Sequence, residues 1–123
     1  MSRFLATRNK GFRMTFENGF AISVQWGPEN YCDRKNEEDF DKPMKERFWE
    51  SKSAEIAVFN KEGRNSMIPI AGYTLENTDG TEESYTDVVS GWLSTNQVAK
   101  VIAIVSSAQT EDEVTKKLKS LNL

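Results

Sequence analysis

Apolar and polar residues alternate along the segment 12–26, on either side of an Asn18-Gly19 step. The apolar positions of the two arms are Phe12, Met14 and Phe16, followed by Phe20, Ile22, Val24 and Trp26. Because successive side chains of a strand point to opposite faces, this period of two indicates strands buried on one face. Asn-Gly between two such runs favours a β-hairpin. The hairpin is therefore the element around which we expect the chain to be organised.

The register of this hairpin follows from its apolar positions. A three-residue loop, 17–19, pairs Phe16 with Phe20 and places the large side chains of both arms on one face. A two-residue loop would place the two arms' apolar residues on opposite faces. Because a slip of one residue is costly when one face is buried, we predict the longer loop, with Gly19 in the left-handed region of a G1 bulge.

More strands are expected after the hairpin. The segment 54–59 is predicted as a strand, and 64–70 as its return arm, with Pro69 indicating an edge position or an early end. A further short strand is predicted at 73–75, before a turn over 77–80. The apolar spacing of 84–92 fits a helix as well as a strand, and its β-branched residues favour the strand.

Two helices are predicted at the C-terminal end. The first spans about 96–108, with Ser94 or Thr95 as N-cap, and its interior is apolar nearly all round, so we expect it to be buried on the sheet. The second begins at Thr110, where Thr-Glu-Asp-Glu is a capping-box pattern. Strands followed by helices predict an α+β fold, an antiparallel β-sheet of about 4–6 strands with two or more hairpins, covered by the two C-terminal helices of 95–121.

We expect one domain over 1–123, with an N-terminal arm at 1–9 and a long charged loop at 27–53. Phe4 and Leu5 are placed to hold the arm against the sheet. Within the loop, Pro43 favours a short helix between 43 and 50 that would make Met44 and Phe48 neighbours. The loop aromatics have two interpretations: they close the core, or they form an exposed recognition surface.

The chain contains no histidine and a single cysteine, Cys32. Ser-His and Cys-His nucleophile pairs are therefore excluded within one chain, and a zinc site is disfavoured. We expect no cofactor and no metal. No apolar run reaches the length of a membrane span, no secretory signal is recognised at the start, and one free thiol favours a reducing, cytoplasmic setting without a membrane partner.

The formal net charge is −3, and it is unevenly distributed. Residues 1–13 carry four basic side chains and no acid, whereas residues 76–87 carry five acids and no base. Either both segments are simply solvated, or one of them meets a partner of opposite charge. A net charge of −3 is too small to suggest a mimic of duplex nucleic acid, and a nucleic-acid partner is not expected.

The candidate binding residues lie in three places. In the turn 26–32, Trp26 and Tyr31 would stack on a base while Asn30 reads a polar edge; alternatively, this turn ends the strand and its aromatics pack on the core. Phe48 and Trp49 are the candidates in the charged loop. Arg64, after the glycine of the turn 60–63, is placed to contact a phosphate, although an ordinary hairpin turn is the simpler interpretation.

The run 23–32, Ser-Val-Gln-Trp-Gly-Pro-Glu-Asn-Tyr-Cys, resembles a pattern of small phage-encoded accessory proteins of unknown function, in which a hairpin ends in Ser-Val-Gln, an aromatic residue and Gly-Pro-x-Asn-Tyr. The strand 54–58, Gly63 and a helix opened by Thr95 and containing Val98 fit the same outline, whereas 33–53 lies outside it. The resemblance implies a phage gene expressed in a bacterial cytoplasm and implies no particular activity.

Small phage accessory proteins often neutralise a host factor or a signalling nucleotide, an analogy rather than a property of these residues. The prediction is therefore a non-enzymatic binding protein, a phage accessory or anti-host-defence factor that captures a host protein or a small nucleotide-like ligand. Edge strands and aromatic surfaces also allow a homo-oligomer. The alternatives are a histidine-free enzyme that uses carboxylates and a structural component of a virion or assembly.

Overall fold

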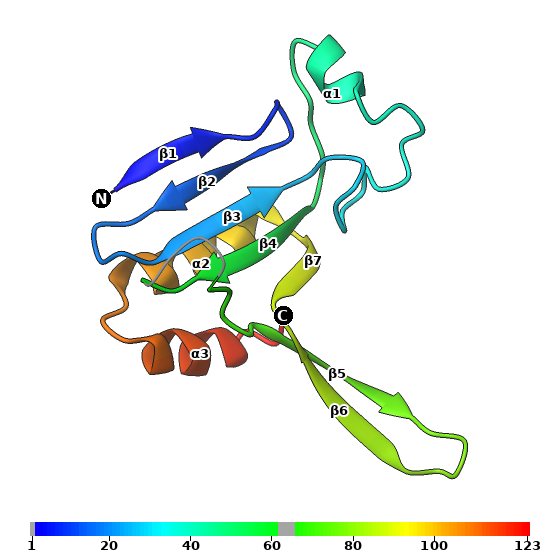
Figure 1. The fold of residues 1–123 in the computed structure, drawn as a ribbon, viewed down its shortest axis with the longest axis vertical. Helices are drawn as coiled ribbons and strands as arrows, with labels where there is room; N and C mark the ends of the chain where they lie inside the picture. The colour runs from blue at the N-terminus through cyan, green and yellow to red at the C-terminus, as the bar shows by residue number, and fades with distance from the viewer. Residues whose placement is uncertain (1, 62–65) are drawn as a thin grey trace.

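A five-stranded antiparallel sheet, in the order β1-β2-β3-β4-β7, forms the body of the molecule (Figure 1). The computed structural model describes residues 2–61 and 66–123. Its strands are β1 (Arg3–Ala6), β2 (Gly11–Thr15), β3 (Ala21–Gln25), β4 (Ala54–Phe59), β5 (Ala71–Glu76), β6 (Glu82–Asp87) and β7 (Val89–Leu93). Its helices are α1 (Lys42–Lys45), α2 (Thr95–Ser107) and α3 (Glu111–Lys119). The predicted α+β class, with antiparallel strands followed by two C-terminal helices, is confirmed.

The hairpin of β2 and β3 has the predicted register. Met14 lies opposite Ile22, and the Phe16 N–H donates to the Phe20 carbonyl at 2.8 Å. The Gly19 N–H donates to the Phe16 carbonyl at 2.9 Å, and Gly19 has a φ of +92°. This is the three-residue loop with glycine in the left-handed region, so the hairpin's large side chains share one face.

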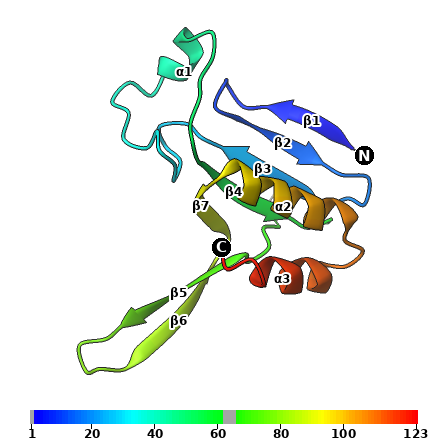
Figure 2. The same cartoon turned by 180° about the vertical axis from the view of Figure 1, so that it is seen from behind.

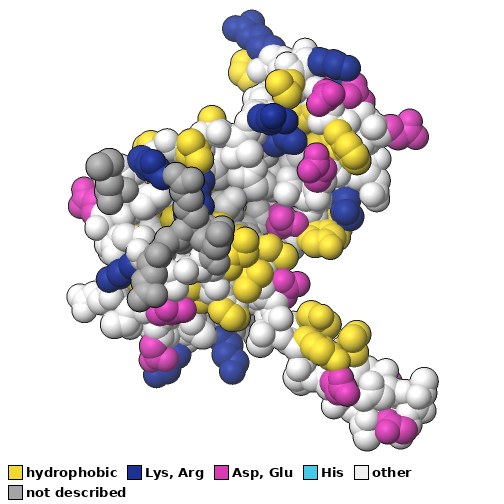
Figure 3. Space-filling view, viewed as in Figure 1, with side chains coloured by type: hydrophobic (Ala, Val, Ile, Leu, Met, Phe, Trp, Pro, Cys, Tyr) yellow, Lys and Arg dark blue, Asp and Glu magenta, His cyan; other side chains and the backbone are white. Residues whose placement is uncertain are grey.

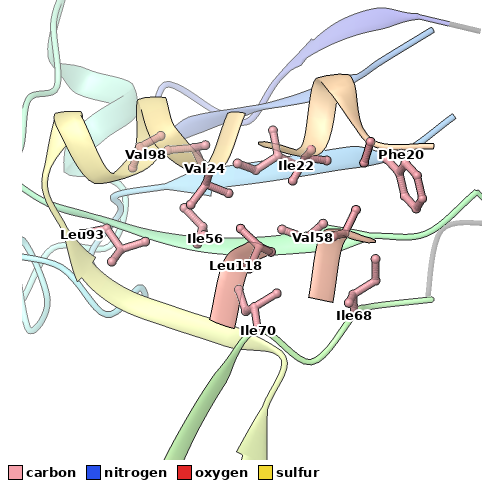
Figure 4. Close-up of a cluster of buried hydrophobic side chains, with 14 of the residues drawn as sticks. Phe20, Ile22, Val24, Ile56, Val58, Ile68, Ile70, Leu93, Val98 and Leu118 are labelled. Atoms are coloured by element: carbon pink, nitrogen blue, oxygen red, sulfur yellow. The ribbon is translucent and has the colours of Figure 1, made fainter. Parts of the chain in front are cut away.

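That face packs against α2 and α3 to form the main core. Figure 4 shows side chains from β3 and β4 meeting those of the helices and of the segment 68–70. The labelled core residues are Phe20, Ile22, Val24, Ile56, Val58, Ile68, Ile70, Leu93, Val98 and Leu118. Helix α2 lies over β3 and β4, as the view from behind shows (Figure 2). The sheet therefore has one helix-covered face.

Helix α2 is less buried than its sequence predicts. Val98, Val101 and Val105 are buried, but Ile102 is only partly buried and Ala99 is exposed. The expected packing of the helix on the sheet is confirmed, but it is buried through one stripe only, and its small alanines tolerate water on the other side. The predicted caps are confirmed: Ser94 accepts from the Gln97 N–H and Thr110 from the Glu113 N–H.

The N-terminal arm joins the sheet. Residues 3–6 form β1, the outermost strand, with Phe4 opposite Met14. The exposed fraction of Phe4 is nevertheless 80%. The predicted return arm 64–70 is described from residue 66, and there it makes a single bridge between Phe59 and Met67.

The remaining strands form a separate two-stranded ribbon, β5–β6, which projects from the body (Figures 1 and 2). Its tip is the predicted turn over 77–80, where the Asn77 N–H donates to the Thr81 carbonyl at 2.7 Å. Residues 84–92 lie mainly in the strands β6 and β7, so the prediction of a strand rather than a helix for this segment is confirmed.

Helix α1 is shorter than predicted. Pro43 lies in its first turn, but the backbone is already extended at Glu46. The expected i, i+4 neighbours Met44 and Phe48 are therefore not on one helix, because the chain leaves the helical conformation between them. Across residues 2–61 and 66–123, none of the helices has both the length and the apolar character needed to cross a bilayer.

Candidate functional site

The turn after β3 is fixed to the sheet by its own polar groups. The Asn30 Oδ1 accepts from the Gly27 N–H at 2.9 Å, and its Nδ2 donates to the Glu55 carboxylate at 3.3 Å. The same carboxylate accepts from the Tyr31 N–H at 2.9 Å. Both ends of the Asn30 amide are thus used inside the protein, which favours a structural role for Asn30 over ligand recognition. The arrangement presents the Tyr31 side chain at the surface.

Tyr31 meets Trp92, which the sequence analysis did not select. The Trp92 N–H donates to the Tyr31 carbonyl at 2.8 Å, and the two ring centroids are 5.5 Å apart. Gly91 permits this approach, because a Cβ there would lie 2.4 Å from the Tyr31 Cβ. A glycine inside a strand is one signal of a close approach, and it was available in the sequence.

Trp92 is held in an unusual conformation. Its φ is +53°, a region that bulky residues rarely occupy, and 56% of its surface is exposed. The hydrogen bond to the Tyr31 carbonyl and the contact between the two rings stabilise this geometry. An exposed tryptophan in a costly backbone conformation is a feature that clusters at functional sites.

A cavity of about 400 Å³ lies beside this aromatic pair, at the base of the ribbon. The aromatic residues Tyr31, Tyr73 and Trp92 line it together with Asp87 and Ser90. Tyr73 is itself stacked on Tyr85, with ring centroids 5.3 Å apart. We name the cavity lined by Tyr31, Tyr73, Asp87, Ser90 and Trp92 the aromatic site.

Charged groups near the aromatic site come from the loop 27–53 and from β6. The Lys35 ammonium lies 4.8 Å from the centroid of the Tyr31 ring, a cation on the same aromatic surface. Tyr85 donates its hydroxyl proton to Glu83, and this hydrogen bond raises the pKa of Tyr85. The site therefore combines ring faces for stacking with one cation and one carboxylate, Asp87, within reach of its lining.

Two other predicted residues, Trp26 and Trp49, form a separate pair. Each indole N–H donates to the other residue's carbonyl at 2.9 Å, and only 7% of Trp49 is exposed. The Arg34 guanidinium stacks on Trp49 at 3.9 Å from its ring centroid. Trp49 thus closes the core, which is the first of the two interpretations given for the loop aromatics, rather than forming part of an exposed recognition surface.

Trp26 and Trp49 line an apolar groove of about 410 Å³ between the sheet and α2. Phe12, Val98 and Ile102 also line the groove, and the Phe12 ring meets the Trp26 ring edge to face. With few polar atoms in its lining, the groove suits an apolar side chain better than a charged ligand.

The charged loop 27–53 is held together by its own ion pairs. Lys45 lies 2.9 Å from Asp39, and their hydrogen bond lowers the pKa of Asp39 and raises that of Lys45. Glu37 accepts from Lys42 at 3.3 Å and pairs with Arg34 at 3.6 Å. Besides Tyr31, the exposed large apolar side chains of this loop are Phe40, Met44 and Phe48, and the exposed fraction of Phe48 is 77%.

The predicted residues are therefore not one site. Tyr31 joins the aromatic site, Trp26 and Trp49 join the groove, and Phe48 stands apart on the loop. Arg64 lies outside the described residues. In the described ranges, no group of three His, Cys, Asp or Glu side chains is arranged to hold a metal ion.

Comparison with protein-family models, with curated proteins and with solved structures finds no match for this chain.

Proposed function

We propose that this protein is a non-enzymatic binding protein that captures a small nucleotide-like ligand at the aromatic site. The observation that carries the proposal is the exposed Trp92, held at a φ of +53° against Tyr31 beside a cavity of about 400 Å³. Aromatic faces bind bases of any sequence, and each stacked base contributes about 1–3 kcal/mol.

Polar groups give this site its selectivity. A base stacked on Trp92 would meet the carboxylate of Asp87, an acceptor for an exocyclic amine, and Lys35 would attract the phosphate. The absence of histidine from the sequence agrees with binding rather than turnover, because the commonest general base is missing. Capture of a signalling nucleotide also fits a phage accessory or anti-host-defence factor acting in a bacterial cytoplasm, the setting that the resemblance of 23–32 implies.

The test is binding of mononucleotides and of cyclic di- and trinucleotides, followed by calorimetry and by native mass spectrometry. We expect Trp92→Ala to weaken binding at least tenfold, since it removes a stacking surface. The matched control is Phe48→Ala, which removes an exposed aromatic ring from another part of the surface and should leave the affinity unchanged. Equal binding by the Trp92 variant, or a ligand recovered as a cleaved product, would contradict capture at this site.

A second candidate, capture of a host protein, is favoured by the exposed loop side chains. Phe40, Met44 and Phe48 are exposed in the loop 27–53, and Phe48 precedes Trp49, which lines the apolar groove. Exposed apolar clusters of this kind are typical of protein interfaces. In a pull-down from bacterial host lysate, Phe48→Ala should lose a partner that Trp92→Ala retains. If Trp92→Ala lost the partner and Phe48→Ala retained it, the partner would bind at the aromatic site instead.

A further inference from the structure

The β5–β6 ribbon lacks the partners that a two-stranded sheet needs. It pairs only with itself among the described strands, and residues 72–76 and 82–86 are exposed. A lone two-stranded hairpin is at best marginally stable in water. Its face carrying Tyr73, Leu75 and Tyr85 also leaves apolar area uncovered.

The ribbon also lacks counter-charges. Glu76 lies directly opposite Glu82, a like-charge pair that destabilises a ladder, and the segment 76–87 contains no basic residue. On the face seen in Figure 3 the ribbon carries acidic side chains and no basic ones. The ribbon thus presents free strand edges, an apolar stripe on one face and the Glu76–Glu82 pair on the other.

Strand β1 offers the complement of each of these features. It is the outermost strand of the sheet, so the backbone groups of its free edge have no strand partner among the described residues. Phe4 and Leu5 are exposed on it. Arg3 lies in β1 and Arg8 lies in the turn that follows. The segment 1–13 that contains them has no acidic residue. Neither arginine forms an ion pair with another described residue.

These two surfaces lie on opposite sides of one molecule, as both ribbon views show (Figures 1 and 2). A chain therefore cannot place its own ribbon on its own β1. Because one sequence carries both complementary surfaces, the partner that matches both is another molecule of the same sequence.

We propose that the β5–β6 ribbon of one copy adds to the free β1 edge of a second copy. Backbone pairing extends the sheet, and Tyr73 and Leu75 then share the face of Phe4. Glu76 and Glu82 point to the other face of the ribbon, where they lie on the side of Arg3, with Arg8 in the turn at the end of β1. The inference does not depend on a ligand at the aromatic site, and it specifies the surfaces of the homo-oligomer that the sequence only allows.

The experiment exchanges the charges of the two surfaces. A ribbon variant carries Glu76→Lys and Glu82→Lys, and an edge variant carries Arg3→Glu and Arg8→Glu. Native mass spectrometry and light scattering after size exclusion, at micromolar concentration and low salt, report the oligomer. We expect an oligomer for the wild-type chain and monomers for each variant alone, because like charges then face each other.

An equimolar mixture of the two variants should restore an oligomer that contains both chains. Every contact in the mixture joins opposite charges, since the Lys-bearing ribbon meets the Glu-bearing edge and the native ribbon meets the native edge. High salt should weaken the wild-type oligomer, because the Debye screening length falls to about 3 Å at an ionic strength of 1 M.

The control is Lys116→Glu with Asp112→Lys, a charge exchange on α3, away from both surfaces, that should leave the oligomer intact. Circular dichroism melts establish that each variant is folded. A wild-type monomer, single variants that still assemble, or a mixture that stays monomeric would each overturn the proposal.

Discussion

Trp92 is a residue whose backbone conformation is imposed by its neighbours. Nothing in its own chemistry favours a φ of +53°, and left-handed geometry costs an L-residue roughly 1–2 kcal/mol. The cost is offset by the hydrogen bond to the Tyr31 carbonyl and by the ring contact with Tyr31. A functional reason for keeping tryptophan here is its exposed ring at the aromatic site.

Replacing Trp92 tests this strain separately from ligand binding. Trp92→Gly should be more stable than Trp92→Ala by roughly 1 kcal/mol, because both lose the ring but only glycine adopts the left-handed region freely. Urea unfolding of the two variants gives the difference. At Val89, earlier in the same strand, the order should reverse, with alanine the more stable. Equal stability of the two Trp92 variants would mean that the backbone there is unstrained.

Glu113 links the stability of α3 to pH. Its carboxylate accepts from the Gln109 N–H and from Lys117, each at 2.8 Å, and these contacts lower the pKa of Glu113. A depressed pKa in the folded state contributes stability above the unfolded-state pKa, and that stability is lost as the pH falls through the folded-state value.

Glu113→Gln should therefore lower the melting temperature at neutral pH, and the difference from the wild-type chain should shrink as the pH falls through the folded-state pKa of Glu113, because the wild-type carboxylate then also becomes protonated. Thermal melts across this range provide the measurement. Glu111→Gln, which removes a carboxylate from the same helical turn, is the matched control. A constant difference at all pH values would exclude ionisation of Glu113 as the cause.

At the scale of elements, the hairpin turn also caps a helix. The Asn18 side-chain amide donates to the Val105 and Ala108 carbonyls, each at 2.8 Å, at the C-terminal end of α2. Its Oδ1 accepts from the Phe20 N–H at 3.0 Å. A turn residue expected to serve only the hairpin thus joins the hairpin to the helix 87 residues further along the chain.

Asn18→Ala should lower the free energy of unfolding by about 1–3 kcal/mol, since helix carbonyls lose their donor. Asn18→Asp should cost at least as much, because a carboxylate would face those carbonyls at the negative end of the helix. Urea denaturation distinguishes the two roles of Asn18. If only the turn mattered, Asp-Gly would serve as well as Asn-Gly, and Asn18→Asp would be nearly neutral.

At the scale of the whole molecule, the body and the ribbon differ in how they are stabilised. The body buries its strands β3 and β4 under α2 and α3, whereas the ribbon depends on its own ladder and on the hydrogen bond from Ile70 to Asp87 at 2.9 Å. Local stability follows buried contacts, so the two parts should open independently.

Hydrogen exchange measures this difference. In dilute protein, amides of β5 and β6 should exchange far faster than those of β3 and β4. At concentrations where the copies assemble, the ribbon and β1 amides should slow together, while the β3 and β4 amides are unchanged. Slow ribbon exchange in a monomer would contradict its independence from the body.

The sequence by itself determined the local elements of this protein. The hairpin register followed from apolar alternation around Gly19, and the N-caps Ser94 and Thr110 from side chains that bond neighbouring backbone groups. These features are set by residues close in the chain, so they can be predicted from periodicity and hydrogen-bonding chemistry without knowledge of the tertiary structure. The α+β class followed from the order of those elements. The length of α1 was mispredicted because a helix of four residues has too little periodicity to place its end.

Only the tertiary structure decided which side chains meet. Tyr31 and Trp92 come from a loop and an edge strand far apart in sequence, and their contact depends on how Glu55 holds the intervening turn and on the space left by Gly91. The same is true of Trp26 and Trp49, which close the core together rather than forming one site with Tyr31. Long-range contacts depend on the path of the whole chain, and no local pattern encodes that path.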